Sequence, residues 1–299
     1  MIKKILLLAL VAFGLFFTSC SNDDDNNGSS TKNITLNISG LEDLGSDFVY
    51  EGWIMVNSTP VSTGTFTEVT SGQTFAIDTV QLNAATSFIL TIEPSGETGT
   101  AADTPSDTKL LKGDFSGNSA TVSIMTIGDF TTITPSGKFF LRSPTDETGG
   151  TNNNNDENGI WFGMPGAPPT ASLILPTLPS GWKYEGWVVD AAGPLTTGTF
   201  TAYDVADDNA GAADSFSGTE NTGPPIPGED LLINAPTGFT FPIDIRGKEV
   251  VISIEPSPDN SPNPFLLKPL KGTAGNDIAP AVNDLTFDDT SFPTGTVTR

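Results

Sequence analysis

The sequence Tyr50-Glu51-Gly52-Trp53 recurs in the second half of the chain as Tyr184-Glu185-Gly186-Trp187. Further blocks follow in the same order in both places, with 63–67 matching 197–201, 90–95 matching 252–257 and 111–113 matching 270–272. The difference in residue number between matching residues is larger for the third and fourth blocks than for the first two. The second copy therefore carries an insertion between its second and third blocks. Two copies of one long unit predict two similar domains in tandem.

The repeated blocks have the pattern of short β-strands. Tyr50 and Ile54 fall on one face of an alternating segment, and Trp53 falls on the other. Turn-forming residues at 57–60 and 190–194 predict a hairpin in each copy. Each copy therefore begins with two antiparallel strands.

A later apolar strand is expected in each copy. It ends at Pro94 in the first copy and at Pro256 in the second, because proline has no N–H to donate to a ladder. No segment of ten or more residues has the apolar periodicity of a helix. The fold class that we expect is all-β, with two tandem β-sandwich-like domains.

The expected domain boundaries follow from the repeat. The first β-sandwich repeat spans 33–164, and its opening strand contains Ile34, Leu36 and Ile38 in alternation with polar residues. The Asn-rich stretch 148–159 is expected to be a flexible loop. The second repeat spans 165–299, with an acidic, Pro/Gly-rich insertion near 202–227.

The N-terminus resembles a bacterial lipoprotein signal. Residues 1–19 contain a short basic region and an apolar run that ends in small residues before Cys20, the chain's single cysteine. On this resemblance the signal peptide is removed and Cys20 is lipidated, which attaches the protein to the membrane. An ordinary secretory signal is the alternative.

An acidic tether at 20–32 follows, and its polar composition predicts an extended, flexible segment. It is similar to the acidic motif that marks surface-exposed lipoproteins in Bacteroidota. We therefore expect a lipid anchor in the outer membrane and display on the cell surface, with the periplasmic face as the alternative.

The composition excludes several kinds of chemistry. The 299 residues include no histidine, which rules out His-based nucleophile systems and His-ligated zinc. One cysteine cannot form an internal disulfide. Thirteen basic residues against 36 acidic ones give a net charge of −23, which argues against nucleic acid as a partner.

The repeated carboxylates have a structural interpretation. Glu51 and Glu185 occupy equivalent places in separate domains, so we expect each to make a local hydrogen bond rather than to form a catalytic pair. Glu93 and Glu255 precede strand-ending prolines and are expected to make turn contacts. A glycosidase would need two carboxyl groups roughly 5–9.5 Å apart.

The tryptophans divide into two classes. Trp53 and Trp187 lie within alternating strands and are expected in the core. Trp161 lies beside the Asn-rich loop and Trp182 follows a Ser-Gly turn, so these two are the candidates for exposed rings that contact a ligand.

The acidic residues of the insertion offer oxygen ligands of the type that Ca²⁺ prefers. Their spacing does not match a known calcium loop, so no metal and no cofactor is expected there. No catalytic residue stands out either, and the chain is not expected to be an enzyme.

The combination of Tyr50, Trp53, a Gly64-x-Phe66 strand and a terminal Glu93-Pro94 is similar to the extracytoplasmic C-terminal domain of anti-sigma-K-type factors. The second copy has the same pattern. The resemblance implies an all-β extracytoplasmic module. Such factors have a sigma-binding region and a transmembrane helix before this domain, whereas here only the lipoprotein signal precedes it, so sigma-factor sequestration is not carried over.

Three functions remain open from the sequence. The first is a non-enzymatic, lipid-anchored envelope or cell-surface protein that binds an unknown extracellular or envelope ligand or has a structural role. The second is a sensory or regulatory envelope protein related to anti-sigma-factor ectodomains. The third is a carboxylate-dependent, carbohydrate-active enzyme.

Overall fold

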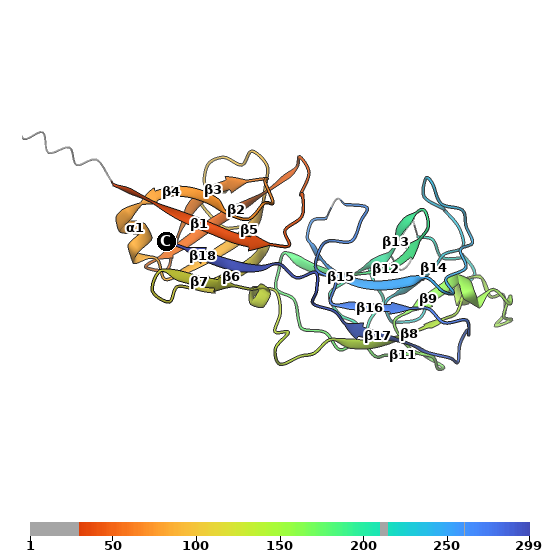
Figure 1. Cartoon of the computed structure of the whole chain (residues 1–299). Helices are drawn as coiled ribbons and strands as arrows, with labels where there is room; N and C mark the ends of the chain where they lie inside the picture. The colour runs from red at the N-terminus through yellow and green to blue at the C-terminus, as the bar shows by residue number, and fades with distance from the viewer. Residues whose placement is uncertain (1–29, 210–214, 260) are drawn as a thin grey trace, which may run out of the picture.

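The computed structural model describes residues 30–209, 215–259 and 261–299, and these form two β-rich lobes arranged end to end (Figure 1). The fold is all-β, as the sequence predicts. The proposed signal peptide, Cys20 and most of the acidic tether lie outside the described residues. Among the described residues, no helix is both long enough and apolar enough to cross a membrane.

The N-terminal lobe contains two four-stranded antiparallel sheets, with strand orders β3-β2-β5-β6 and β4-β1-β18-β7. Its strands are β1 (Thr31–Ser39), β2 (Phe48–Val56), β3 (Thr59–Phe66), β4 (Gln73–Asp78), β5 (Ser87–Pro94), β6 (Lys109–Asp114), β7 (Ser119–Val122) and β18 (Thr294–Thr298). One short helix, α1 (Thr79–Ala84), connects β4 to β5, and a 3-10 turn, η1 (Ile124–Thr126), follows β7. The Asp78 carboxylate caps α1 by accepting from the backbone N–H groups of Val80 and Gln81.

The C-terminal lobe contains one eight-stranded sheet, of order β13-β12-β15-β16-β17-β8-β9-β14. Its strands are β8 (Ser136–Leu141), β9 (Gly159–Trp161), β12 (Trp182–Asp190), β13 (Gly193–Phe200), β14 (Gly228–Asp230), β15 (Glu249–Pro256), β16 (Leu270–Thr273) and β17 (Asn283–Phe287). A small ribbon of β10 (Gly163–Met164) and β11 (Thr170–Ala171) and the 3-10 turns η2 (Pro144–Asp146) and η3 (Asp156–Asn158) complete the lobe.

The two lobes have corresponding strand orders. The series β3-β2-β5-β6 corresponds to β13-β12-β15-β16, and the series β4-β1-β18-β7 corresponds to β14-β9-β8-β17. In the C-terminal lobe the two series join where β16 pairs with β17. The internal repeat of the sequence is therefore a repeat of the fold.

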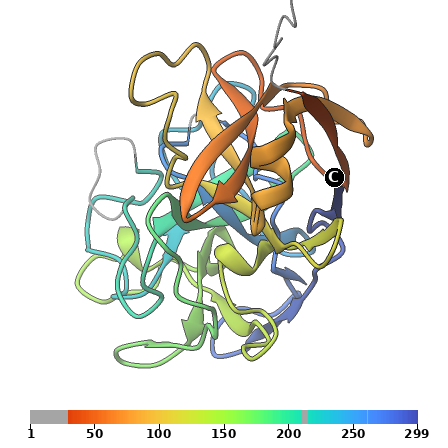
Figure 2. The ribbon, with the colours of Figure 1, turned by 90° about the vertical axis from the view of Figure 1, so that its left-hand side faces the viewer.

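The strand pairing follows a different division from the expected boundary between residues 164 and 165. Strands β8 and β9, which precede that boundary, pair with each other and with strands β17 and β14 of the C-terminal lobe. Strand β18, at the far end of the chain, pairs with β1 and β7 of the N-terminal lobe. Figure 2 shows the C-terminal strand beside the first strand of the chain. Pairing between distant segments is not visible in a sequence repeat.

The repeated motif forms the same hairpin in both lobes, which confirms the predicted strands and turns. Tyr50 stacks on Phe66 with ring centroids 5.5 Å apart, and Tyr184 stacks on Phe200 at 5.6 Å. The register shifts after the motif glycine in both hairpins. A Cβ on Gly52 would lie 2.3 Å from the hydroxyl oxygen of Thr63, so only glycine fits there, and Gly186 meets Thr197 at the same distance.

The cores confirm the predicted alternation. Ile34, Leu36 and Ile38 of β1 are buried, and their polar neighbours are more exposed. Trp53 and Trp187 are only 1 and 2 % exposed, as expected for core residues. These two rings lie on the strand faces opposite to Tyr50 and Tyr184, where they contact the buried hydroxyls of Thr91 and Ser253.

Candidate functional site

A cleft of about 600 Å³ lies between the two lobes. The N-terminal lobe contributes the loop 42–48 between β1 and β2, the end of β5, and the segment 106–108. The C-terminal lobe contributes the end of β15 and the segment after it, including Phe265. Where the lobes touch, the Ser180 hydroxyl donates to the Asp107 carboxylate at 3.0 Å. The ends of β5 and β15 are equivalent in the two repeats, whereas the loop 42–48 comes from the first repeat alone.

The cleft is acidic at its rim and apolar in its walls. Ring and aliphatic surface comes from Phe48, Ile92 and Phe265, together with several prolines. Neither Lys nor Arg is among the described residues that line it. The lining carboxylates are Glu42, Asp43, Asp47, Glu97, Asp107, Glu255 and Asp259. Such a surface is complementary to a group that carries positive charge.

A buried glutamate in each repeat is linked to the motif tryptophan through a hydroxyl group. In the first, the Trp53 indole N–H donates to the Thr91 hydroxyl at 2.9 Å, and that hydroxyl donates to Glu93. In the second, Trp187 donates to Ser253 at 2.7 Å, and Ser253 donates to Glu255. We call each of these chains a Trp–hydroxyl–Glu relay.

The expected turn contacts of the relay glutamates are present. Glu93 accepts from the backbone N–H of Ser106 at 2.9 Å, and Glu255 accepts from that of Phe265 at 2.9 Å. The neighbouring motif glutamates make the expected local hydrogen bonds, with Ser62 donating to Glu51 and Thr196 donating to Glu185. These carboxylates therefore hold together strands and turns of their own repeats.

Burial raises the pKa of several of these groups. It raises the pKa of Glu255 to about 8 against the opposing effect of the Ser253 hydrogen bond, and it raises the pKa of Glu185 to about 7. Burial likewise raises the pKa of Glu42 to about 7, although the nearby Lys268 opposes the shift. The cleft wall thus contains carboxyl groups that titrate near neutral pH.

One group of three carboxylates is compact enough to consider for a metal. Oxygen atoms of Glu185, Glu255 and Asp259 all lie within 4.8 Å of one another. Glu185 and Glu255 each already accept hydrogen bonds from their own repeat, and Asp259 accepts from the backbone N–H of Ser261 at 2.8 Å. Each of the three carboxylates thus accepts a hydrogen bond from its own lobe, and two of them, Glu255 and Asp259, line the cleft.

The structure places Trp161 and Trp182 in the interior instead of on the surface. Trp182 is 2 % exposed and packs on Phe265, with ring centroids 6.0 Å apart. It begins β12 on the same face as Tyr184, and this alternation directs its ring into the core. Because Phe265 lines the cleft, Trp182 lies directly behind the cleft wall.

Trp161 is 4 % exposed and belongs to a polar cluster in the C-terminal lobe. Its indole N–H lies 3.0 Å from the Arg142 carbonyl and 3.1 Å from the Asp230 carboxylate. The ring also lines a second cavity, of about 550 Å³, under the insertion. Any ligand contact of Trp161 would therefore be made inside that cavity.

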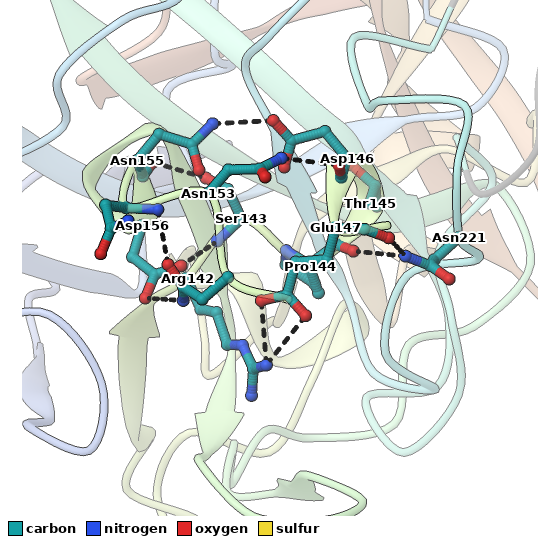
Figure 3. Close-up of polar contacts among 12 residues, drawn as sticks. Arg142, Ser143, Pro144, Thr145, Asp146, Glu147, Asn153, Asn155, Asp156 and Asn221 are labelled. Atoms are coloured by element: carbon teal, nitrogen blue, oxygen red, sulfur yellow. Dashed lines mark hydrogen bonds and ion pairs between the residues drawn. The ribbon is translucent and has the colours of Figure 1, made fainter. Parts of the chain in front are cut away.

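Hydrogen bonds to the segment 142–147 hold the Asn-rich loop in place, which differs from the flexible loop expected (Figure 3). The side-chain amides of Asn153 and Asn155 donate to the backbone and carboxylate oxygens of Asp146, at 2.7 and 2.8 Å. The Nη2 group of Arg142 donates to both carboxylate oxygens of Glu147, at 3.0 and 3.2 Å. Asparagine amides supply both donors and acceptors, and this explains why a polar loop can pack closely.

Three buried carboxylates lie in or directly after the insertion of the second repeat, with Asp207 inside it and Glu229 and Asp230 in β14. Asp207 accepts from the backbone N–H of Gly228 at 2.8 Å, Asp230 accepts from that of Thr145 at 2.8 Å, and Glu229 accepts from Ser215. Burial raises the pKa of all three to about 7. Residues 210–214 of the insertion lie outside the described residues.

Comparison with known proteins identifies one similarity. Residues 27–108 match the family described as anti-sigma-K factor rskA, C-terminal. The searches of curated proteins and of solved structures found no match. The match confirms the resemblance expected from the Tyr50 motif, and it covers β1 to β5, including the N-terminal wall of the cleft.

The cleft itself was not found by sequence reasoning. Its walls come from segments that are far apart in the chain, such as Glu42 and Asp259, and only the arrangement of the lobes brings them together. One signal was available, because Glu97 and Asp259 occupy equivalent places shortly after the two relay glutamates. The repeat could therefore have indicated a shared acidic segment, but not its position between the lobes.

Proposed function

We propose that this chain is a non-catalytic sensory or regulatory protein of a bacterial envelope, and that the cleft between the lobes is its binding site. The observation that carries the proposal is the match of residues 27–108 to the C-terminal family of an anti-sigma factor. The matched region supplies the loop 42–48 and Glu97, which form one wall of the cleft. The resemblance and the cavity thus concern the same part of the molecule.

The chemistry of the cleft favours binding over catalysis. Its buried glutamates are occupied by hydrogen bonds from Ser253, Thr196 and the backbone of Phe265. The rim carboxylates and the apolar walls fit a peptide segment that combines a Lys or Arg side chain with apolar neighbours. A protein partner in the envelope is the type of ligand that a regulatory domain would bind.

The lipid anchor on Cys20 belongs to the same proposal. Attachment to the outer membrane through this residue would hold the lobes outside the cytoplasm on an acidic tether. Growth with a radiolabelled fatty acid, comparing the natural chain with Cys20→Ser, tests the anchor. Protease shaving of intact cells then separates display on the cell surface from the periplasmic face.

Site-specific photo-cross-linking in intact cells tests the binding site. A photoreactive amino acid at Ser46, an exposed cleft residue, is expected to give a discrete adduct with a partner. The matched control is Val80, which is 75 % exposed on α1 and is absent from the cleft lining. Equal labelling at both positions, or none at Ser46, would contradict a binding role for the cleft.

A surface adhesin remains the second candidate, because a large acidic protein on a tether suits display. Mass spectrometry of the Ser46 adduct distinguishes the two functions. An envelope protein of the same cell supports the regulatory function, whereas a host or matrix protein supports adhesion.

A further inference from the structure

Each lobe contains one strand that comes from the end of the other repeat. Strand β8 follows β7 in the chain but pairs with β9 and β17 in the C-terminal lobe. Strand β18 follows β17 but pairs with β1 and β7 in the N-terminal lobe. In Figure 1 the end of the chain, in dark blue, lies among the red and orange strands of the N-terminal lobe.

The two crossing strands are equivalent in sequence. Strand β8 begins within Pro135-Ser136-Gly137, and β18 begins within Pro293-Thr294-Gly295. The spacing between these two motifs is nearly the same as the spacing between the matching blocks 111–113 of β6 and 270–272 of β16. Strands β8 and β18 are thus the same element of the repeat.

The pairing register supports the same equivalence. Gly137 lies opposite Leu285 of β17, and Gly295 lies opposite Val122 of β7. Two residues after each glycine, Phe139 and Val297 are fully buried. Each strand therefore fills the same place in the lobe that it enters.

The two connections that cross between the lobes meet at an aromatic cluster. Phe130 lies in the connection from β7 to β8, and Phe292 lies in the connection from β17 to β18. Their ring centroids are 5.3 Å apart, and Phe287 at the end of β17 packs against both. The crossing point is thus a packed contact.

Strand β18 is also held by side-chain contacts in the lobe that it enters. The Arg299 guanidinium, next to the strand, donates to the carbonyl oxygens of Leu82 and Ala85 at 2.8 and 2.6 Å, and it lies 4.3 Å from the ring centroid of Phe115. These contacts satisfy carbonyls at the end of α1.

We propose that the two repeats are a reciprocally strand-exchanged pair within one chain. The edges of β1 and β7 that pair with β18, and the edges of β9 and β17 that pair with β8, are recognition surfaces for the last strand of a second copy of the repeat. The covalent chain supplies that second copy. Neither repeat completes its own second sheet, so cutting the chain between the repeats leaves two fragments that share both lobes.

The experiment is cleavage of the full-length chain at an engineered protease site in the exposed segment 166–168, between β10 and β11. This cut lies beside the boundary between residues 164 and 165 that the sequence predicts. The strand correspondence, in which β9 matches β1, ends the first repeat between β8 and β9, and the cut leaves each lobe with strands from both fragments. The cut protein is passed over a size-exclusion column at nanomolar concentration, and native mass spectrometry and tryptophan fluorescence are recorded across a urea series.

Strand exchange predicts a 1:1 complex of the two fragments that persists at nanomolar concentration. It also predicts that the fragments separate only at urea concentrations that unfold the protein. Separation into two folded fragments, on dilution or below the unfolding transition, would overturn the proposal, because surface contact alone would then hold the lobes together. A second cut site in the exposed residues 149–153 gives the same prediction if the first substitution impairs folding.

Discussion

The hairpins β2–β3 and β12–β13 have the same pairing register and the same shift after the motif glycine, whereas the segments that follow them differ. After β3, Phe75 of β4 lies against Gly64, but at the equivalent place after β13 the Asp207 carboxylate lies against Gly198. The first repeat then forms α1, and the second forms a long insertion with buried carboxylates. The same arrangement of strands can therefore pack against either apolar or polar side chains, provided that each buried polar group is hydrogen-bonded.

The largest effect is expected from substitutions in the exchanged strands, since each strand supports the lobe of the other repeat. Val297→Asp places a charge in the core of the N-terminal lobe, and Phe139→Asp does so in the C-terminal lobe, at a cost of about 4 kcal/mol each. Hydrogen exchange measured by mass spectrometry should show lost protection at β1 and β7 for the first variant, and at β9 and β17 for the second.

Thr296→Asp is the matched control, because Thr296 is exposed on the same strand. It should leave the hydrogen exchange of both lobes unchanged. Loss of protection in the C-terminal lobe alone in Val297→Asp would show that β18 supports its own repeat.

Substitutions in the two Trp–hydroxyl–Glu relays are expected to cause a smaller loss of stability, of equal size in the two repeats. Thr91→Val and Ser253→Ala each remove the hydroxyl that links a buried tryptophan to a buried glutamate. Each should lower the free energy of unfolding by about 1–3 kcal/mol, because the indole N–H loses its acceptor. Urea unfolding checks both. A cost in only one repeat would mean that the relays are not equivalent.

The buried carboxylates of the second repeat should make the free energy of unfolding depend on pH. Burial raises the pKa of Asp207 and Glu229 to about 7, well above the value of about 4 expected for an unfolded chain. The folded state therefore holds protons that the unfolded state releases. This contribution to stability is present at low pH and is lost as the pH rises from about 4 through 7.

The urea midpoint of the full chain should accordingly be higher at pH 5.5 than at pH 8. Asp207→Asn should reduce this difference, since the amide does not titrate. A midpoint that rises with pH, or a variant with unchanged pH dependence, would contradict the assigned role of these carboxylates.

The smallest effect concerns the hairpin turns. Asn57 and Ser58 have positive φ angles of 49° and 65°, a conformation that favours glycine. Ser58→Gly should raise stability by about 0.5–1 kcal/mol. Ala192→Gly, in the corresponding turn of the second repeat, should not, because Ala192 is not among the residues with positive φ. Thermal unfolding of the two variants tests the difference.

Local features of the fold could be predicted from the sequence because they depend on neighbouring residues. The alternation around Tyr50, the turn after Val56 and the strand end at Pro94 all have local causes. The resemblance to the anti-sigma-K family rested on the same residues.

Features that depend on distant pairing could not be predicted in this way. No feature of the β18 residues themselves indicates that this strand pairs in the N-terminal lobe, near Leu36 and Val122, rather than with strands of its own repeat. The interior position of Trp161 depends on Asp230, which is distant in the chain. The cleft requires both lobes, so the sequence indicated only a turn contact for Glu255 and not the site that it lines.

Chemical cross-linking tests the strand exchange most directly. In a Cys20→Ser background, the exposed partners Asn37 and Thr296 are changed to cysteine in one variant, and Lys138 and Asp284 are changed in a second. A short bifunctional maleimide should join residues 37 and 296 within the monomer as efficiently as residues 138 and 284. A monomer that links only residues 138 and 284, or a link at 37 and 296 that forms only between two chains, would contradict exchange within one chain.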